Sequence, residues 1–478
     1  MQLPTAVSAS PTAPRGTFTP FRHRIFFAIW IANLVSNFGS LIQGVGASWL
    51  MTSLAPGAAM VSLVQASTSL PIMLLSLGAG AIADIHDRRK VMLVAQGFML
   101  AVSAALAALA HAGWLTPWTL LMFTFLIGCG AALNGPAWQS SVGEQVPRED
   151  LPGAVALNSL GFNLARATGP AIGGIVVASF GPETAFLVNA ISYLGLIAVL
   201  VSWQRQPTPT TLAPESLWPA MGAGLRYAAL SPRIDRVLVR AAVFGLLAAA
   251  VWSLLPLVAR DLLAGGPLTY GVLLGSFGSG AVMGALSSTR LRHQLSNERL
   301  VAMTSLVFGL GAATAGLSRT LPLTMLGLVA AGACWVLALS TFNILVQIAS
   351  PRWVVGRTMA VYQMATFGGL AIGSWTWGQV AAAHGVPAAL FSAGGGLLLS
   401  SLLGRWLRLP AGDAPDVEPS GAWGAPRVTI DVDPRSGPVI TVIEYEVPTP
   451  KQAAFVAAMQ PLRRMRRRDG ARGWSLVQ

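Results

Sequence analysis

Acidic residues and lysine are scarce in this sequence. Only 18 of its 478 residues are aspartate or glutamate, and 10% are charged, whereas soluble domains carry about 25% charged residues. Lysine occurs only at Lys90 and Lys451, and neither follows a glycine. The phosphate loop GxxxxGK(S/T) is therefore absent, which excludes ATP use through that motif. With 54% hydrophobic residues, the composition indicates a protein that lies in lipid.

Cysteine and histidine are also few. Cys129 and Cys334 are the two cysteines, they fall in separate apolar segments, and small apolar packing is the favoured interpretation of both. The five histidines lie near predicted helix ends or in loops and form no pair with metal-ligand spacing. We expect no metal, no cofactor and no disulfide framework, and a membrane-embedded enzyme is a weak alternative.

Twelve apolar runs are long enough to cross a bilayer, which takes about 20 residues. The first run is too long for a secretory signal and contains Asn33 and Asn37, so we interpret it as a membrane helix. The runs are 25–50, 58–82, 91–111, 117–139, 153–179, 184–204, 237–260, 268–289, 299–318, 321–347, 357–383 and 386–407.

Basic residues predict the orientation. With a cytoplasmic amino terminus, the outside loops hold only Arg260 and Arg319, and both termini are cytoplasmic, as expected in a cytoplasmic (inner) membrane. The net charge of +13 then faces anionic membrane lipids rather than nucleic acid. The inside loops hold Arg88, Arg89, Lys90, Arg148, Arg205, Arg226, Arg233, Arg236, Arg290, Arg292, Arg299, Arg352 and Arg357.

An internal repeat divides the membrane region. An offset of 204 residues matches Pro147 with Pro351 and Gly169 with Gly373, and the same offset carries Gly80 to Gly284, Arg88 to Arg292 and Gly128 to Gly332. One register across both halves predicts two six-helix bundles related by duplication. We expect a cytoplasmic tail at 1–20, bundles at 21–205 and 237–408, and a cytoplasmic linker at 206–236 with one surface helix.

The carboxyl-terminal region has a different composition. Residues 409–426 form a polar tether, and the alternating segments RVTIDVD and VITVIEYEV predict two strands, followed by a helix at 448–470. We expect a small cytoplasmic α+β module at 427–478, which resembles the first part of a ferredoxin-like module. The arginines near the end of its helix fit lipid headgroups, nucleic acid or a solvated helix end: Arg463, Arg464, Arg466, Arg467 and Arg468.

The connector between the second and third runs carries Gly80, Asp84, Arg88 and Arg89. It resembles the loop motif GxxxDRxGRR of the major facilitator superfamily, and the resemblance covers roughly residues 21–408. It implies a twelve-helix fold in which Asp84 meets the positive end of the eleventh helix's dipole as a cytoplasmic latch, with Arg88 as the accompanying cation. In the second half, Ser288 occupies the position that matches Asp84.

The segment LNSLGFNLARATGPAIGG, 157–174, resembles the fifth helix of the drug and siderophore efflux branch that includes the enterobactin exporter and macrolide efflux proteins. Arg166 is the one charged residue that we place deep in a membrane helix, where a charge is costly, and Asn163 lies one turn away. Arg166 therefore either pins this helix to a neighbour or contacts substrate or a gate.

Small residues indicate helix packing in three GxxxG motifs. These are formed by Gly169 and Gly173, by Gly280 and Gly284, and by Gly369 and Gly373, and Pro170 predicts a kink. In the resembled fold the first, fourth, seventh and tenth helices line the cavity. They supply these candidates for substrate or coupling contacts: Asn33, Asn37, Gln43, Asn134, Trp138, Trp252, Trp335, Asn343 and Gln347.

These features together predict an all-α membrane protein that exports a small organic compound as a secondary active transporter. The resemblance implies proton coupling and a monomer, although no carboxylate lies deep in a predicted helix. The alternative is a membrane-bound sensor or scaffold in which the helices are a degenerate transporter core and the tail signals.

Overall fold

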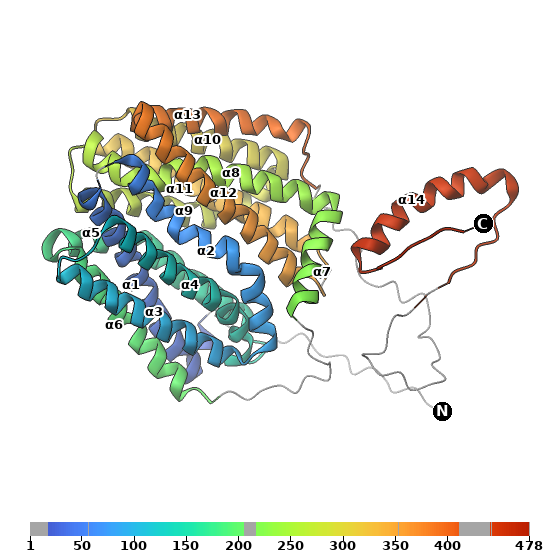
Figure 1. The fold of residues 1–478 in the computed structure, drawn as a ribbon, viewed down its shortest axis with the longest axis horizontal. Helices are drawn as coiled ribbons and strands as arrows, with labels where there is room; N and C mark the ends of the chain where they lie inside the picture. Colours follow the sequence, from blue (N-terminus) through green and yellow to red (C-terminus); the bar gives the residue numbers. More distant parts are fainter. Residues whose placement is uncertain are drawn as a thin grey trace.

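The structure, a computed structural model, describes residues 18–55, 57–204, 217–351, 353–410, 440 and 442–477, and this part of the chain is predominantly helical (Figure 1). A long helix overlaps every one of the twelve predicted runs. These helices are α1 Arg24–Leu54, α2 Ala58–Ile85, α3 Arg88–His111, α4 Pro117–Gln145, α5 Leu151–Phe180, α6 Pro182–Ser202, α8 Pro232–Leu257, α9 Pro267–Gln294, α10 Asn297–Leu317, α11 Leu321–Ile348, α12 Val355–His384 and α13 Val386–Ser400.

Local sequence signals set the helix ends. Thr116 caps α4 through a reciprocal pair of hydrogen bonds with Thr119, at 3.2 and 2.8 Å. Between α5 and α6 the chain turns at Gly181, with φ of 85°, and between α12 and α13 it turns at Gly385, with φ of 87°. Glycine adopts this left-handed conformation at little cost, so the same turn occurs at equivalent places in both halves.

Helix neighbours follow one pattern twice. In the first set α1 packs on α5 and α6, α3 on α4 and α6, and α2 on α4. In the second set α8 packs on α12 and α13, α10 on α11 and α13, and α9 on α11. The pairs α2 with α12 and α5 with α9 join the two sets (Figure 1).

The register between the sets is not the single offset that we expected. Leu151 and Val355, the first residues of α5 and α12, are 204 residues apart, whereas Ala58 and Pro267, the first residues of α2 and α9, are 209 apart. The matches of Gly80 with Gly284 and of Arg88 with Arg292 are therefore wrong. The cause is that α3 and the loop after it are together five residues longer than α10 and its loop. His293, not Ser288, stands at the position that corresponds to Asp84.

Ten of the long helices are apolar enough to be candidate membrane spans among the described residues. The exceptions are α5, which holds Asn163 and Arg166, and α12, which holds Arg357 and Gln363. Both are nevertheless 30 residues long. The chain is therefore a multi-pass helical membrane protein.

Two helices lie outside the long set. The amphipathic α7, Leu217–Leu230, falls within the predicted linker, and α8 begins at Pro232, earlier than the predicted 237. The tail contains α14, Gln452–Arg468, which Figure 1 shows apart from the main helical body. Short helical turns occupy Thr19–Arg22, Val258–Leu262, Ser401–Arg405 and Thr449–Lys451.

The tail contacts α7 through an arginine and an aromatic ring. The Arg468 guanidinium lies 4.9 Å from the centre of the Tyr227 ring, and burial raises the pKa of the Tyr227 hydroxyl while Arg468 opposes that shift. The first predicted strand, 427–433, lies outside the described residues, and residues 442–447 form no strand. The α+β module stays a prediction.

Candidate functional site

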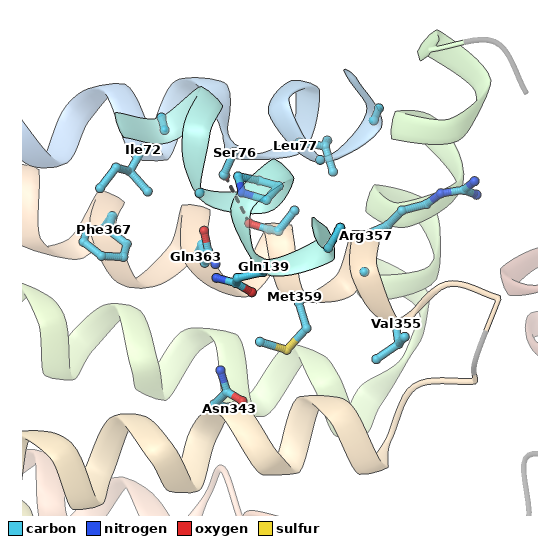
Figure 2. A pocket seen from close by; sticks show the side chains of 18 of the residues that line it. Ile72, Ser76, Leu77, Gln139, Asn343, Val355, Arg357, Met359, Gln363 and Phe367 are labelled. Atoms are coloured by element: carbon cyan, nitrogen blue, oxygen red, sulfur yellow. Dashed lines mark hydrogen bonds between the residues drawn. The ribbon is translucent and has the colours of Figure 1, made fainter. Parts of the chain in front are cut away.

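A cavity of about 960 Å³ lies where α2, α4 and α11 end and α12 begins. Its lining comes from both sets of helices, with α2 and α4 facing α11 and α12 (Figure 2). In Figure 2 the side chains of Gln139, Gln363 and Asn343 converge on this space from α4, α12 and α11. The hydroxyl of Ser76 on α2 donates to the carbonyl of Ala360 on α12 at 3.3 Å and bridges the two sets beside the cavity.

The cavity lining is polar but almost uncharged. Four amides, two hydroxyls and one guanidinium are interspersed with apolar side chains, and no carboxylate of the described side chains lines the cavity. Such a surface suits a mostly apolar molecule with a few neutral polar groups. The polar lining residues are Ser76, Gln139, Ser140, Asn343, Gln347, Arg357 and Gln363, and the bulkier apolar ones are Ile72, Leu77, Ile85, Met359 and Phe367.

The opposite end of the helical body is closed by direct contacts between the two sets. A Cβ built on Gly271 of α9 would lie 2.5 Å from the carbonyl oxygen of Pro170 and 2.9 Å from the Cα of Gly174 on α5. Backbone therefore meets backbone there, because no side chain intervenes. Trp49 of α1 stacks on the buried Tyr270 of α9 with ring centres 6.5 Å apart.

A charged group adds to this closure. The guanidinium of Arg260, just after α8, donates to the carbonyl of Thr52 near the end of α1 at 2.8 Å. Its Nε also donates to Asp261 at 2.6 Å. The two ends of the body thus differ: one is hollow and lined by amides, and the other is sealed by glycines, stacked rings and an arginine.

The predicted latch residues separate into two groups in the structure. Gly80 lines the cavity, and the α2 backbone that carries Asp84 ends beside the first turn of α12, although the Asp84 side chain lies outside the described atoms. Arg88 instead pairs with Glu144 of α4 at 2.8 Å, and Arg89 donates to the last carbonyls of α6 at Leu200 and Val201. Both arginines therefore connect helices of the first set.

The predicted substrate-contact residues are distributed unevenly. Asn343 and Gln347 line the cavity, where the Gln347 amide donates to Asn343. Asn134 accepts a hydrogen bond from Gln96 at 3.2 Å, and Asn163 donates to the carbonyl of Ser159 in its own helix. Asn33 and Asn37 are half-buried on α1.

The expectation that the first, fourth, seventh and tenth membrane helices line the cavity is half wrong. The fourth and tenth, α4 and α11, do line it, but α2 and α12 replace α1 and α8. The polar Gln43 of α1 shows why: it accepts hydrogen bonds from Ser103 of α3 and Asn189 of α6 at 3.0 and 2.6 Å. Gln43 is buried inside the first set, where it stabilises the packing of three helices.

The backbone of Arg166 on α5 packs against α9, where the Arg166 carbonyl faces Gly278. The guanidinium carbon lies 5.5 Å from the ring centre of Phe162 and 5.8 Å from that of Trp252 on α8. Among the described residues it forms no ion pair with a carboxylate.

The glycine motifs occupy close helix contacts. Gly169 and Gly173 face α1, where a Cβ would lie 3.1 Å from Leu41 and 3.0 Å from the backbone of Ile42. Gly369 and Gly373 of α12 face the backbone of α8 in the same way. Pro170 lies inside α5 and is buried.

Sequence reasoning missed five polar residues of the cavity: Gln139, Arg357, Gln363, Ser76 and Ser140. Gln139 follows Trp138, which we chose instead, so a face one residue further along α4 was the correct one. Arg357 was assigned to an inside loop, yet it lies in the first turn of α12. A clustering of amides near the cytoplasmic ends of the predicted helices was the available signal.

Comparisons with known proteins agree with this architecture. The Tap multidrug efflux pump of Mycobacterium tuberculosis is 24% identical over 80% of this chain and 93% of its own length. The enterobactin exporter EntS of Escherichia coli is 27% identical over 80% and 91%. A bacterial homologue of the human lysosomal transporter Spinster, solved in an inward-facing and occupied conformation, matches with a TM-score of 0.65 at 12% identity, over 81% of this chain and 97% of its own.

The model of the transmembrane secretion effector family matches residues 15–478, which is nearly the whole chain. The relatives are transporters, not enzymes. The chain therefore belongs to the transmembrane secretion effector family, in the drug and siderophore efflux branch of the major facilitator superfamily.

Proposed function

We propose that the protein exports a small organic compound, drug-like or siderophore-like, by alternating access. The observation that carries this proposal is the contrast between the two ends of the body, with a cavity of about 960 Å³ at one and backbone contact at the other. Both features lie between the same two sets of helices. A rocking motion that closes one end and opens the other would expose the pathway to each side in turn.

We propose twelve membrane crossings, with α5 and α12 added to the ten candidate spans. At 1.5 Å per residue, the 30 residues of α5 and of α12 extend about 45 Å, which is ample for a bilayer. Both helices also pack between candidate spans, α5 between α1 and α9 and α12 between α2 and α8. The polar residues Arg357 and Gln363 of α12 line the cavity, so this helix is less hydrophobic than one that faces only lipid.

The domain arrangement follows from the same reasoning. The six-helix bundles are 21–205 and 232–408, both termini are cytoplasmic, and 206–231 joins the bundles. The basic residues at the starts of α3 and α12 and at the end of α9 favour a cytoplasmic position for the cavity. The cavity is then inward-open, and the protein acts as a monomer in the inner membrane, with the partial ferredoxin-like module 427–478 as a cytoplasmic accessory.

Export and its energy source rest on the relatives and on charge. The two relatives described above are named as an efflux pump and an exporter. Proton exchange supplies the energy, since a membrane potential contributes about 2.3 kcal/mol per charge per 100 mV. In the described residues, Glu144 lies next to the cavity-lining Ser140 turn and pairs with Arg88, which makes it a candidate for coupling.

Asp84 is proposed to stabilise the state in which the cytoplasmic end is closed. The end of α2 and the first turn of α12 line the same cavity through Ile85, Val355 and Gly356. Closing the cavity brings a carboxylate at the end of α2 to the amino-terminal, positive end of α12.

Accumulation assays test the proposal. Cells with and without the protein are loaded with panels of dyes, macrolides and siderophores, and the assay is repeated after the proton gradient is collapsed. We expect lower accumulation with the protein, and loss of that difference without the gradient. Gln139→Leu and Asn343→Leu should weaken export, whereas Gln460→Leu on exposed α14 is the matched control. Equal accumulation for every compound would refute export.

A further inference from the structure

Arg166 lies near the middle of a membrane helix, and its surroundings differ from those of Arg240, another arginine inside the helical body. Arg240 of α8 is 3% exposed and bonds to Glu298 of α10 at 2.5 Å, so protein supplies its counter-charge. Arg166 lies 15 residues into α5, about 22 Å from its start and near the middle of the helix. Among the described residues no carboxylate pairs with it.

Aromatic rings contact the Arg166 cation but leave its donors available. Phe162, one turn earlier on α5, and Trp252 of α8 place their rings 5.5 and 5.8 Å from the guanidinium carbon. Ring faces attract a cation through their π electrons and accept no ordinary hydrogen bond from its N–H groups. A guanidinium has five such donors, arranged to bind a planar oxyanion through two parallel hydrogen bonds.

A second donor without a partner lies beside this arginine. The indole Nε1 of Trp252 is buried and has no hydrogen-bond partner among the described residues. A buried donor that stays unpaired destabilises the protein, and a ligand acceptor at this position would remove that cost. The Phe162 ring is 49% exposed and offers an apolar wall next to both donors.

We infer that Arg166, with the Trp252 indole N–H, binds the carboxylate or a similar planar oxyanion of the transported compound. This inference rests on the proposed function and narrows its substrate class to organic anions with an aromatic or apolar body. The ring of Phe162 contacts that body, while Arg166 supplies the positive charge that pairs with the oxyanion. An anionic lipid headgroup has the same chemistry and is the competing source.

Equilibrium binding to purified full-length protein tests this site without any transport step. The protein is placed in phosphatidylcholine nanodiscs, and the Kd values of 2-naphthoate and of its uncharged isostere 2-naphthamide are measured by calorimetry. We expect naphthoate to bind about tenfold more tightly or better, as hydrogen bonds to a charged group predict. Arg166→Gln should bring the ratio of the two Kd values to about one.

Further variants keep the test decisive if Arg166→Gln does not fold. Arg166→Lys retains the charge but not the two-point geometry, and Trp252→Phe removes the indole donor, so each should give an intermediate ratio. Arg319→Gln, in an exposed loop, is the control and should leave the ratio unchanged. Equal wild-type affinities for the two probes, or an unchanged ratio in the Arg166 variants, would overturn the site.

Two more experiments show whether the bound anion is a substrate or a lipid, and whether a failure concerns this site or the proposed function. Adding phosphatidylglycerol to the nanodiscs should leave naphthoate binding intact, and loss of binding would assign Arg166 to lipid and overturn the substrate site. Export without any preference for naphthoate would leave the proposed function standing and remove this site. If the protein prefers naphthoate but fails every export assay, the anion site stands and the proposed function is refuted.

Discussion

The two ends of the helical body are built from different residue types. At the sealed end, Gly271 and Gly174 bring backbones together, and Trp49 stacks on Tyr270. At the hollow end the helices stand apart around Gln139, Asn343 and Gln363. Small residues permit close approach of two helices, which suits the sealed end. Amides can bond to water or to a bound molecule, which suits the hollow end.

The largest effect is expected from blocking the sealed end. Gly271→Val places a side chain against the carbonyl of Pro170, and such overpacking costs about 1–3 kcal/mol. The closed state of the sealed end should be disfavoured about five- to 150-fold, with export reduced to a similar extent. Efflux rates in vesicles measure this.

Gly266→Val provides the matched control for that change. Gly266 directly precedes α9, and a Cβ there would meet no atom within 4 Å. Export by this variant should equal that of the wild type. Full export by Gly271→Val would show that the close contact is not needed for closure.

A smaller effect is expected at the hollow end. Asp84→Asn removes the charge proposed to meet the positive end of α12, an interaction worth about 0.3–2 kcal/mol. Transport should slow about two- to thirtyfold while the protein stays inserted and abundant, as initial rates and blots would show. Asp87→Asn is the control, because Asp87 caps α3 and asparagine caps a helix equally well. Wild-type rates in Asp84→Asn would remove the latch role.

A still smaller effect is expected for the arginine at the sealed end. Arg260→Gln loses the bond to the Thr52 carbonyl, worth about 1 kcal/mol or less at a partly exposed site. The rate at which a thiol reagent labels a cysteine introduced at the sealed end should rise no more than about fivefold. Arg319→Gln, exposed on another outer loop, should leave them unchanged. Slower labelling of Arg260→Gln would contradict its role in closure.

The smallest effect is expected for the tail. Truncation after Pro410 removes α14 and its contact with Tyr227 but keeps the bond from the Leu409 N–H to Glu298. Export should be unchanged if the tail is an accessory. Loss of export in a truncated protein that is still inserted would favour the alternative in which the tail controls or signals.

The sequence predicted the helices well because their signals are local. Runs of apolar residues, prolines in first turns and glycine turns at Gly181 and Gly385 depend on neighbours along the chain. The register between the halves could not be found this way, because the longer α3 shifts it without changing any helix's own pattern.

The site was predicted only in part because the rotation of each helix about its axis determines which side chains face the cavity. Gln43 and Gln139 are both amides in apolar helices, yet one is buried among α1, α3 and α6 and the other faces the cavity. Hydropathy does not distinguish these environments. Arg166 was identifiable because a single charge at that depth is costly wherever it points.

Alternating access is tested most directly by distances across both ends in one protein. In a background with Cys129→Ala and Cys334→Ala, spin labels are attached to cysteine pairs replacing His86 and His293 at one end and Trp114 and Arg319 at the other, all exposed. On adding a transported compound, we predict that the His86–His293 distance shortens while the Trp114–Arg319 distance lengthens. Unchanged distances, or changes of the same sign at both ends, would contradict the account.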